Sequence, residues 1–343
     1  MSYLYSFAIW SRCFKALLLF VLLLSDIFPS DFHYNNKIIV PHFSREYNLY
    51  IFLYGIFLYS VVYCTKQMKG YRTMDNRPIG FFDSGLGGLT CIPNLFSELP
   101  QERVIYFGDT ARTPYGSKAV STIRHYATQI ADFLASKGVK MMVIACNTIT
   151  ATCLDELRQR FPDIPIVGII KPAAVKAASC CDEFSRIGVI ATKVTIASDD
   201  YNRMIKEQNP QLKVFSKATP AFVPLIEEGI IDNDIMNLTI KYYLDDFISE
   251  NSIDTLVLGC THYPIIRKNI QNIYPQLRII NPSYEIISRI KDILTEKDML
   301  AAENDRENIF YASDLSENFV NMIQKVLETE KSDLILKFKN LDL

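Results

Sequence analysis

Two short runs decide how this chain folds: Val143-Ile144-Ala145-Cys146-Asn147-Thr148 and Val257-Leu258-Gly259-Cys260-Thr261-His262. Each run is apolar like a buried strand and ends in a cysteine that small polar residues follow at once. One run lies in each half of the chain that follows residue 73. This repetition indicates two duplicated units, each of which brings one thiol from a strand end to a shared cleft.

Apolar strand-like runs alternate with amphipathic stretches on both sides of the cysteine runs. We expect strands at 79–82, 104–109, 140–145, 164–169, 187–191, 213–216, 255–258 and 278–280, and helices at 121–134, 150–160, 195–208, 234–250 and 264–273. A final strand and helix are expected from Phe310 onward, returning to the first unit. Such alternation is typical of parallel α/β layers. The sequence therefore predicts an α/β fold with two similar α/β domains, whose mostly parallel sheets face a shared cleft.

The expected domain boundaries follow from this alternation. The first domain is expected to comprise 74–170 and 281–343, and the second 171–280, with a tight crossover near Lys171-Pro172. Ligands of parallel α/β sheets bind beyond the carboxyl ends of the strands. Four polar or thiol side chains sit at such ends: Asp83, Asp109, Cys146 and Cys260. A polar residue at a strand end can also simply belong to the connecting loop.

The composition of the chain argues against two kinds of function, nucleic-acid binding and metal binding. The 343 residues leave room for two domains, and a net charge of −2 without a basic run gives no reason to expect a nucleic-acid partner. The eight cysteines form no C-x-x-C pair, so no metal site is expected. Free thiols fit a reducing, cytoplasmic compartment.

Residues 1–73 form an unusual apolar extension with two dense runs, Phe14–Phe28 and Leu49–Cys64. Each run is shorter than the roughly 20 residues that a membrane helix needs. Three interpretations stay open: a start codon annotated too far upstream, a membrane anchor, and a signal peptide without a clear cleavage site. We favour the first, because Met74-Asp75-Asn76-Arg77-Pro78 directly precedes the first expected strand.

The polar loops offer several chemistries. The loop Asp83-Ser84-Gly85-Leu86-Gly87-Gly88 matches neither nucleotide-binding glycine motif, so we interpret it as an anion-binding loop for a small carboxylate that leaves Asp83 free for acid–base work, or as a tight turn. Cys146 is either a buried small side chain or a thiol beside hydrogen-bonding Asn147-Thr148. Cys260 precedes Thr261-His262, and an imidazole near a thiol promotes the thiolate. A cysteine-protease-like nucleophile remains an alternative, but it does not explain the second strand-end cysteine.

Four segments together resemble bacterial glutamate racemases of the aspartate/glutamate racemase superfamily. They are Ile79-Gly80-Phe81-Phe82-Asp83-Ser84-Gly85-Leu86-Gly87-Gly88-Leu89-Thr90, Gly108-Asp109-Thr110-Ala111-Arg112-Thr113-Pro114-Tyr115-Gly116, Ala145-Cys146-Asn147-Thr148 and Gly259-Cys260-Thr261-His262-Tyr263-Pro264. The resemblance covers 74–343 and nothing of 1–73. Two departures are Lys171 before Pro172, where many members carry Glu, and Ala191, where glycine is usual.

The resemblance implies an amino-acid racemase that needs no cofactor and uses Cys146 and Cys260 as its two acid/base catalysts. Asp83 would assist Cys146, while His262 and Glu227 would assist Cys260, although adjacent acids before glycine usually mark a solvated helix end. By the same resemblance, Cys146 acts on D-glutamate and Cys260 on L-glutamate. The implied substrate contacts are Asp83, Ser84, Tyr115, Gly116, Asn147, Thr148, Thr261 and His262.

We therefore expect a cytoplasmic enzyme that interconverts L- and D-glutamate and supplies D-glutamate for peptidoglycan. Its partner would be this small substrate, with a homodimer as the expected assembly, and a membrane would be involved only if residues 1–73 are translated. Racemisation of aspartate or a hydantoin by the same two thiols is the nearest alternative. A non-catalytic amino-acid-binding protein is an alternative of another class, but binding alone needs neither cysteine.

Overall fold

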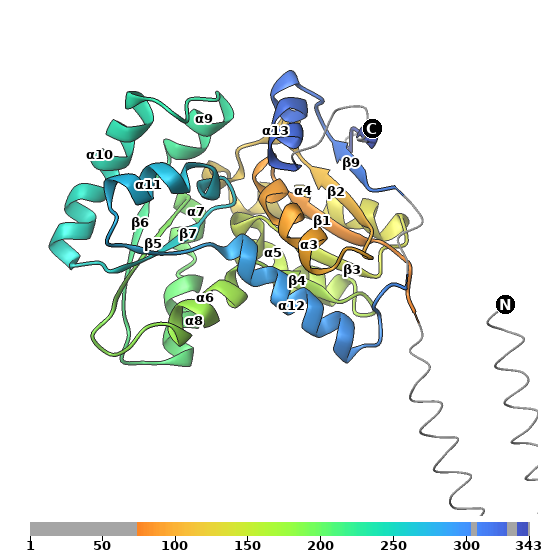
Figure 1. Cartoon of the computed structure of the whole chain (residues 1–343). Coiled ribbons are helices and arrows are strands. Elements are labelled where there is room, and N and C mark those ends of the chain that lie inside the picture. Colours follow the sequence, from red (N-terminus) through yellow and green to blue (C-terminus); the bar gives the residue numbers. More distant parts are fainter. Residues whose placement is uncertain (1–73, 303–306, 328–334, 342–343) are drawn as a thin grey trace, which may run out of the picture. The chain divides into compact units, whose positions relative to one another are not determined.

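The computed structural model describes residues 74–302, 307–327 and 335–341 (Figure 1). The three interpretations of residues 1–73 lie outside the described residues. Within the described ranges, no helix combines the length and the apolar character needed to cross a membrane.

The larger sheet of the described residues has six parallel strands in the order β10-β9-β2-β1-β3-β4. Its strands are β1 (Ile79–Asp83), β2 (Val104–Gly108), β3 (Met141–Ile144), β4 (Ile166–Gly168), β9 (Ile309–Ala312) and β10 (Ile335–Phe338). β9 pairs with β2, so the prediction that the tail returns to the first unit is confirmed. β1 to β3 are fully buried, as expected for strands that are covered on both faces.

The smaller sheet repeats the design of the larger one. It contains β5 (Arg186–Ala191), β6 (Lys213–Ala218), β7 (Thr255–Gly259) and β8 (Arg278–Ile280), all parallel, in the order β6-β5-β7-β8. This is the order β2-β1-β3-β4 of the larger sheet, so β5 corresponds to β1 and β7 to β3. The predicted α/β fold with parallel sheets is confirmed. Cys146 follows β3 and Cys260 follows β7, and the two thiols therefore occupy equivalent places.

Helices connect the strands of both sheets (Figure 1). Their bounds are α3 (Ile92–Glu98), α4 (Val120–Ser136), α5 (Asn147–Arg160), α6 (Ile170–Ser179), α7 (Lys193–Ala197), α8 (Asp200–Gln208), α9 (Phe222–Glu227), α10 (Asp234–Asn251), α11 (Arg267–Ile273), α12 (Pro282–Glu296) and α13 (Glu317–Leu327), with 3₁₀ turns η1 (Gly87–Cys91), η2 (Thr110–Arg112), η3 (Tyr115–Ser117) and η4 (Tyr263–Ile266).

Two of these helices join the sheets into one body. α6 and α12 contact each other, and a single apolar cluster includes Phe81 and Val143 from the larger sheet with Val189 and Val257 from the smaller one. The predicted crossover near residue 171 falls within α6, which occupies 170–179. Pro172 lies in the first turn of α6, where backbone N–H groups have no partner within the helix and proline costs little.

Candidate active site

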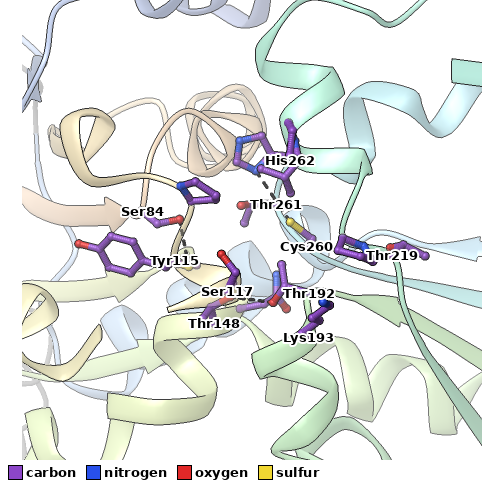
Figure 2. A pocket seen from close by; sticks show the side chains of 17 residues that line it. Ser84, Tyr115, Ser117, Thr148, Thr192, Lys193, Thr219, Cys260, Thr261 and His262 are labelled. Atoms are coloured by element: carbon purple, nitrogen blue, oxygen red, sulfur yellow. Dashed lines mark hydrogen bonds between the residues drawn. The ribbon is translucent and has the colours of Figure 1, made fainter. Parts of the chain in front are cut away.

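A cavity lies where the carboxyl ends of both sheets meet (Figure 2). It encloses about 620 Å³ of empty space, its mouth included. Nine of the residues expected from the sequence line it: Ser84, Tyr115, Gly116, Cys146, Asn147, Thr148, Cys260, Thr261 and His262. The two other expected residues, Asp83 and Glu227, lie behind this lining and contact it through hydrogen bonds. The structure therefore gathers the predicted set around one space.

Cys146 connects β3 to α5. Its backbone is extended and forms the N-cap of α5, so the thiol stands at the strand end, 4 % exposed. Its Sγ donates to Oγ of Ser84 at 3.5 Å. Burial, together with the negative charge of Asp83, raises the pKa of Cys146 to about 12. At neutral pH this sulfur is a thiol that can donate a proton.

Cys260 has a different neighbourhood. Its Sγ lies 3.8 Å from Nδ1 of His262, and Nε2 of that ring lies 2.9 Å from Oε1 of Glu227. Burial disfavours the charged imidazole, but Cys260 and Glu227 outweigh burial and raise the pKa of His262 to about 10. Near neutral pH, Cys260 therefore lies beside an imidazolium. Glu227 is the last residue of α9 with a side chain 20 % exposed, so it is a helix end but not a solvated one.

Asp83 joins the two units at the base of the site. It is fully buried, accepts from the backbone N–H of Gly85 at 2.9 Å, and accepts from Oγ1 of Thr261 at 3.0 Å. Burial raises its pKa. Both of its carboxylate oxygens therefore accept hydrogen bonds, and the expected acid–base role of Asp83 stays a prediction.

Asn147 and Thr148 form the first turn of α5 and are both buried. Oγ1 of Thr148 lies 3.0 Å from Oγ1 of Thr192 and 3.3 Å from Oγ1 of Thr195, so the helix start contacts the other unit. Oδ1 of Asn147 accepts from Tyr201. These short polar side chains line the cavity beside the first thiol.

Tyr115 and Gly116 reach the cavity from η3. The Tyr115 hydroxyl points away from the cavity (Figure 2) and donates to Oδ2 of Asp109, which also accepts from Nε of Arg112 at 2.8 Å. Burial and the charge of Asp109 raise the pKa of Tyr115. Gly116 is required here because a Cβ atom would lie 2.4 Å from Cβ of Thr192. The segment therefore offers its backbone and ring to a ligand, not its hydroxyl group.

Sequence reasoning missed several lining residues. Thr192 follows β5 and Thr219 follows β6, and Lys193 is an exposed cation on the lining. The rule that ligands bind at carboxyl ends of strands would have found the two threonines. In the described residues, no cluster of three or more His, Cys, Asp or Glu side chains could hold a metal ion.

When two thiols line one cavity, one sulfur can take a proton from a ligand while the other donates a different proton to it. The family model for Asp/Glu/hydantoin racemases matches residues 91–287 of this chain.

The chain belongs to this racemase family.

Within the family, the chain is 41 % identical over 271 residues to the glutamate racemase of Chlorobaculum tepidum, covering 78 % of this chain and 99 % of that one. The crystal structure of glutamate racemase from Francisella tularensis in complex with D-glutamate matches with a TM-score of 0.72 and 40 % identity, over 78 % of this chain and 99 % of that one. The Escherichia coli glutamate racemase, in complex with L-glutamate and the activator UDP-MurNAc-Ala, matches with a TM-score of 0.64 and 26 % identity, over 76 % and 98 %. These relatives place the chain among the glutamate racemases, which are isomerases.

Proposed function

We propose that this racemase interconverts L- and D-glutamate by removing the α-proton with one thiol and returning a proton to the opposite face from the other. The main support for this proposal is that Cys146 and Cys260 follow equivalent strands and line one cavity. Relatives of the chain are named glutamate racemases, and two solved ones hold D-glutamate and L-glutamate. These names support glutamate as the substrate.

We propose a resting state in which Cys146 is a thiol and Cys260 is a thiolate. Cys146, with its pKa near 12, carries a proton. A cation at Nδ1 of His262, 3.8 Å from Sγ of Cys260, stabilises negative charge on that sulfur. In the proposed forward step, the Cys260 thiolate takes the α-proton of L-glutamate and becomes a thiol, while the Cys146 thiol donates its proton to the other face. The product is D-glutamate, and the reverse reaction restores both sulfurs.

Titratable side chains next to the two thiols would restore the protonation states that the thiols had before each turnover. We propose that Asp83 assists Cys146, since its charge already affects that thiol, and that His262 assists Cys260. Glu227 would keep the imidazole protonated and oriented through its 2.9 Å contact.

The carbanion needs stabilisation at its α-carboxylate, because this mechanism uses no cofactor as an electron sink. Fixed hydrogen-bond donors are effective at such a site when water is excluded. We propose that Asn147 and Thr148 provide these donors, because the hydroxyl group of Thr261 already donates to Asp83. Ser84 and the backbone of Tyr115-Gly116 would hold the side-chain carboxylate of glutamate.

The cellular setting follows from this chemistry. We propose that the enzyme supplies D-glutamate for peptidoglycan, works as a homodimer and acts in the cytoplasm, where a reducing environment keeps both thiols free. We also propose the domain division 74–170 plus 281–343 and 171–280, which is supported by the strands of the two sheets falling on either side of it.

The test follows α-proton exchange and optical rotation of the full chain with L-glutamate in D₂O, without added pyridoxal phosphate. We expect deuterium to enter the α-position and rotation to decay to zero. Cys146→Ala and Cys260→Ala should each lower kcat/KM by at least about 10³-fold, whereas the control Cys153→Ala, a buried thiol outside the cavity lining, should retain activity. Near-normal turnover by Cys146→Ala or Cys260→Ala would refute the two-thiol scheme. Deuterium exchange into aspartate but not into glutamate would refute glutamate as the substrate.

A further inference from the structure

The side-chain amide of Asn147 is held by a residue that is not among those lining the cavity. Tyr201, from α8 beside the smaller sheet, donates from its hydroxyl group to Oδ1 of Asn147 at 2.7 Å. Asn147 is the first residue of α5 and belongs to the unit of the larger sheet. The two residues are 3 % and 2 % exposed, respectively. A buried hydrogen bond therefore connects the two units next to the candidate site.

This bond determines which face of the amide meets a ligand. An asparagine side chain has one acceptor oxygen and one donor nitrogen. Because the Tyr201 hydroxyl occupies the oxygen, Nδ2 is turned the other way. Within the described part of the chain, Nδ2 of Asn147 is buried and has no hydrogen-bond partner, although Asn147 lines the cavity. Buried donors are rarely left unpaired, so this one is suited to an acceptor oxygen that a ligand brings.

Tyr201 also lies close to the strand end that precedes the second thiol. Its ring packs against the end of β7, where a Cβ on Gly259 would lie 3.1 Å from Cε2 of Tyr201. Burial, with a smaller contribution from Cys260, raises the pKa of Tyr201, and the phenol remains a donor throughout the working range of pH. One side chain thus contacts the strand that carries Cys260 and the residue that follows Cys146.

We propose that Tyr201 is a positioning residue that orients Asn147 so that Nδ2 donates to the substrate α-carboxylate, where negative charge grows as the α-proton leaves. This inference rests on the proposed function and names a further residue that the reaction needs. Tyr201 touches no reacting atom and acts only through Asn147. Its loss should therefore lower kcat more than it raises KM, because the affected hydrogen bond strengthens in the transition state.

The test compares Tyr201→Phe with Tyr274→Phe in the full chain. Each substitution removes one hydrogen-bonded hydroxyl group and keeps the ring, and Tyr274 donates to Asp245 at 2.6 Å. Neither Tyr274 nor Asp245 lines the cavity. We expect Tyr201→Phe to lower kcat/KM for glutamate by about 10- to 100-fold, equally in both directions. Tyr274→Phe should keep wild-type constants, and thermal unfolding should show that both variants are folded.

A double-mutant cycle separates positioning from general support of the fold. In an Asn147→Ala background, Tyr201→Phe should cause no further loss, because the amide that it orients is already gone. Two outcomes would overturn the proposal: wild-type kcat and KM in Tyr201→Phe, or losses from Tyr201→Phe and Asn147→Ala that multiply. A wild-type chain that fails to racemise glutamate in the same assay would instead overturn the proposed function, and this inference would fall with it.

Discussion

At the scale of single residues, Cys146 and Cys260 follow equivalent strands of the two sheets, but the charged groups around the two thiols differ. Asp83 contributes a negative charge that helps to raise the pKa of Cys146, whereas Cys260 lies beside an imidazolium. L- and D-glutamate have equal free energies, so kcat/KM must be equal in the two directions whatever the asymmetry of the site. In the proposed mechanism, the asymmetry therefore concerns which thiol carries a proton in the resting enzyme, and not the balance between the two directions.

The pH dependence of kcat/KM should reflect the protonation state of His262. Its pKa is raised to about 10, so the ring is a cation below that pH and loses its charge above it. We expect kcat/KM to decline as pH rises through about 10, because Cys260 then loses the neighbouring positive charge. His262→Gln should lower kcat/KM by about 10²-fold at pH 8 and should lack this decline. Circular dichroism of glutamate between pH 7 and 11 measures both.

Stability provides the control for this pH experiment. A raised folded-state pKa gives a stabilising contribution that is fully present below the unfolded value of 6.5 and is lost as pH rises through about 10. The free energy of unfolding of the wild type should therefore fall over this window more than that of His262→Gln. An alkaline decline in activity that persists unchanged in His262→Gln would assign it to another group.

At the scale of elements, the close packing of the turn η1 against the end of β7 explains why this turn contains glycine. A Cβ on Gly87 would lie 2.4 Å from Oγ1 of Thr261 and 2.6 Å from Nδ1 of His262. The turn can approach the end of β7 this closely only without a side chain. The glycines thus allow contact between the two units at the site.

Gly87→Ala should displace Thr261 and His262, lower kcat/KM by at least about 10-fold and cost about 1–3 kcal/mol of unfolding free energy. Gly138→Ala is the matched control, since a Cβ there meets nothing within 4 Å but the residue has a φ of +68°. It should cost about 1 kcal/mol of unfolding free energy and keep full activity. Steady-state kinetics and urea denaturation distinguish the two patterns, and an active Gly87→Ala would contradict the close approach.

Buried strands were readable from the sequence because they are almost continuously apolar, and β3 and β7 begin and end within one or two residues of their predicted bounds. Helix limits were less readable. The start of α5 lies three residues before the predicted one, because polar Asn147 and Thr148 are buried by the site and not by the apolar stripe. The predicted helix at 195–208 is divided at Asp199, whose φ of +58° leaves no trace in hydrophobic spacing.

The same contrast holds for the site. Cys146, Cys260 and their neighbours stand in local motifs, so sequence reasoning and the family resemblance found them. Tyr201 was missed because its role depends on a partner 54 positions away that only the packing of α8 brings close. The hydrogen bond from Thr261 to Asp83 was also missed, because it crosses between the two units.

At the scale of the whole molecule, the hydrogen bonds that cross between the units gather at the cavity, whereas a buried ion pair lies at the other end of the larger sheet. Nζ of Lys140 lies 2.6 Å from Oε2 of Glu102, and both side chains are fully buried. The same Nζ donates to the carbonyl oxygens of Asp75 at 2.6 Å and Met299 at 2.7 Å. This cation therefore ties the chain before β1 to the segment that follows α12.

Lys140→Met should lower the free energy of unfolding by about 3–5 kcal/mol, because it leaves the buried Glu102 carboxylate without its cation. Lys140 precedes β3, whereas Cys146 follows it, so kcat and KM of the folded variant should stay at wild-type values. Adding Glu102→Leu should recover much of the loss, since an apolar replacement of both partners removes the unpaired charge. Arg160→Met is the matched control, because it breaks an exposed pair with Asp132 and should leave the urea midpoint nearly unchanged. Equal midpoints for Lys140→Met and the wild type would show that this end of the sheet does not depend on the ion pair.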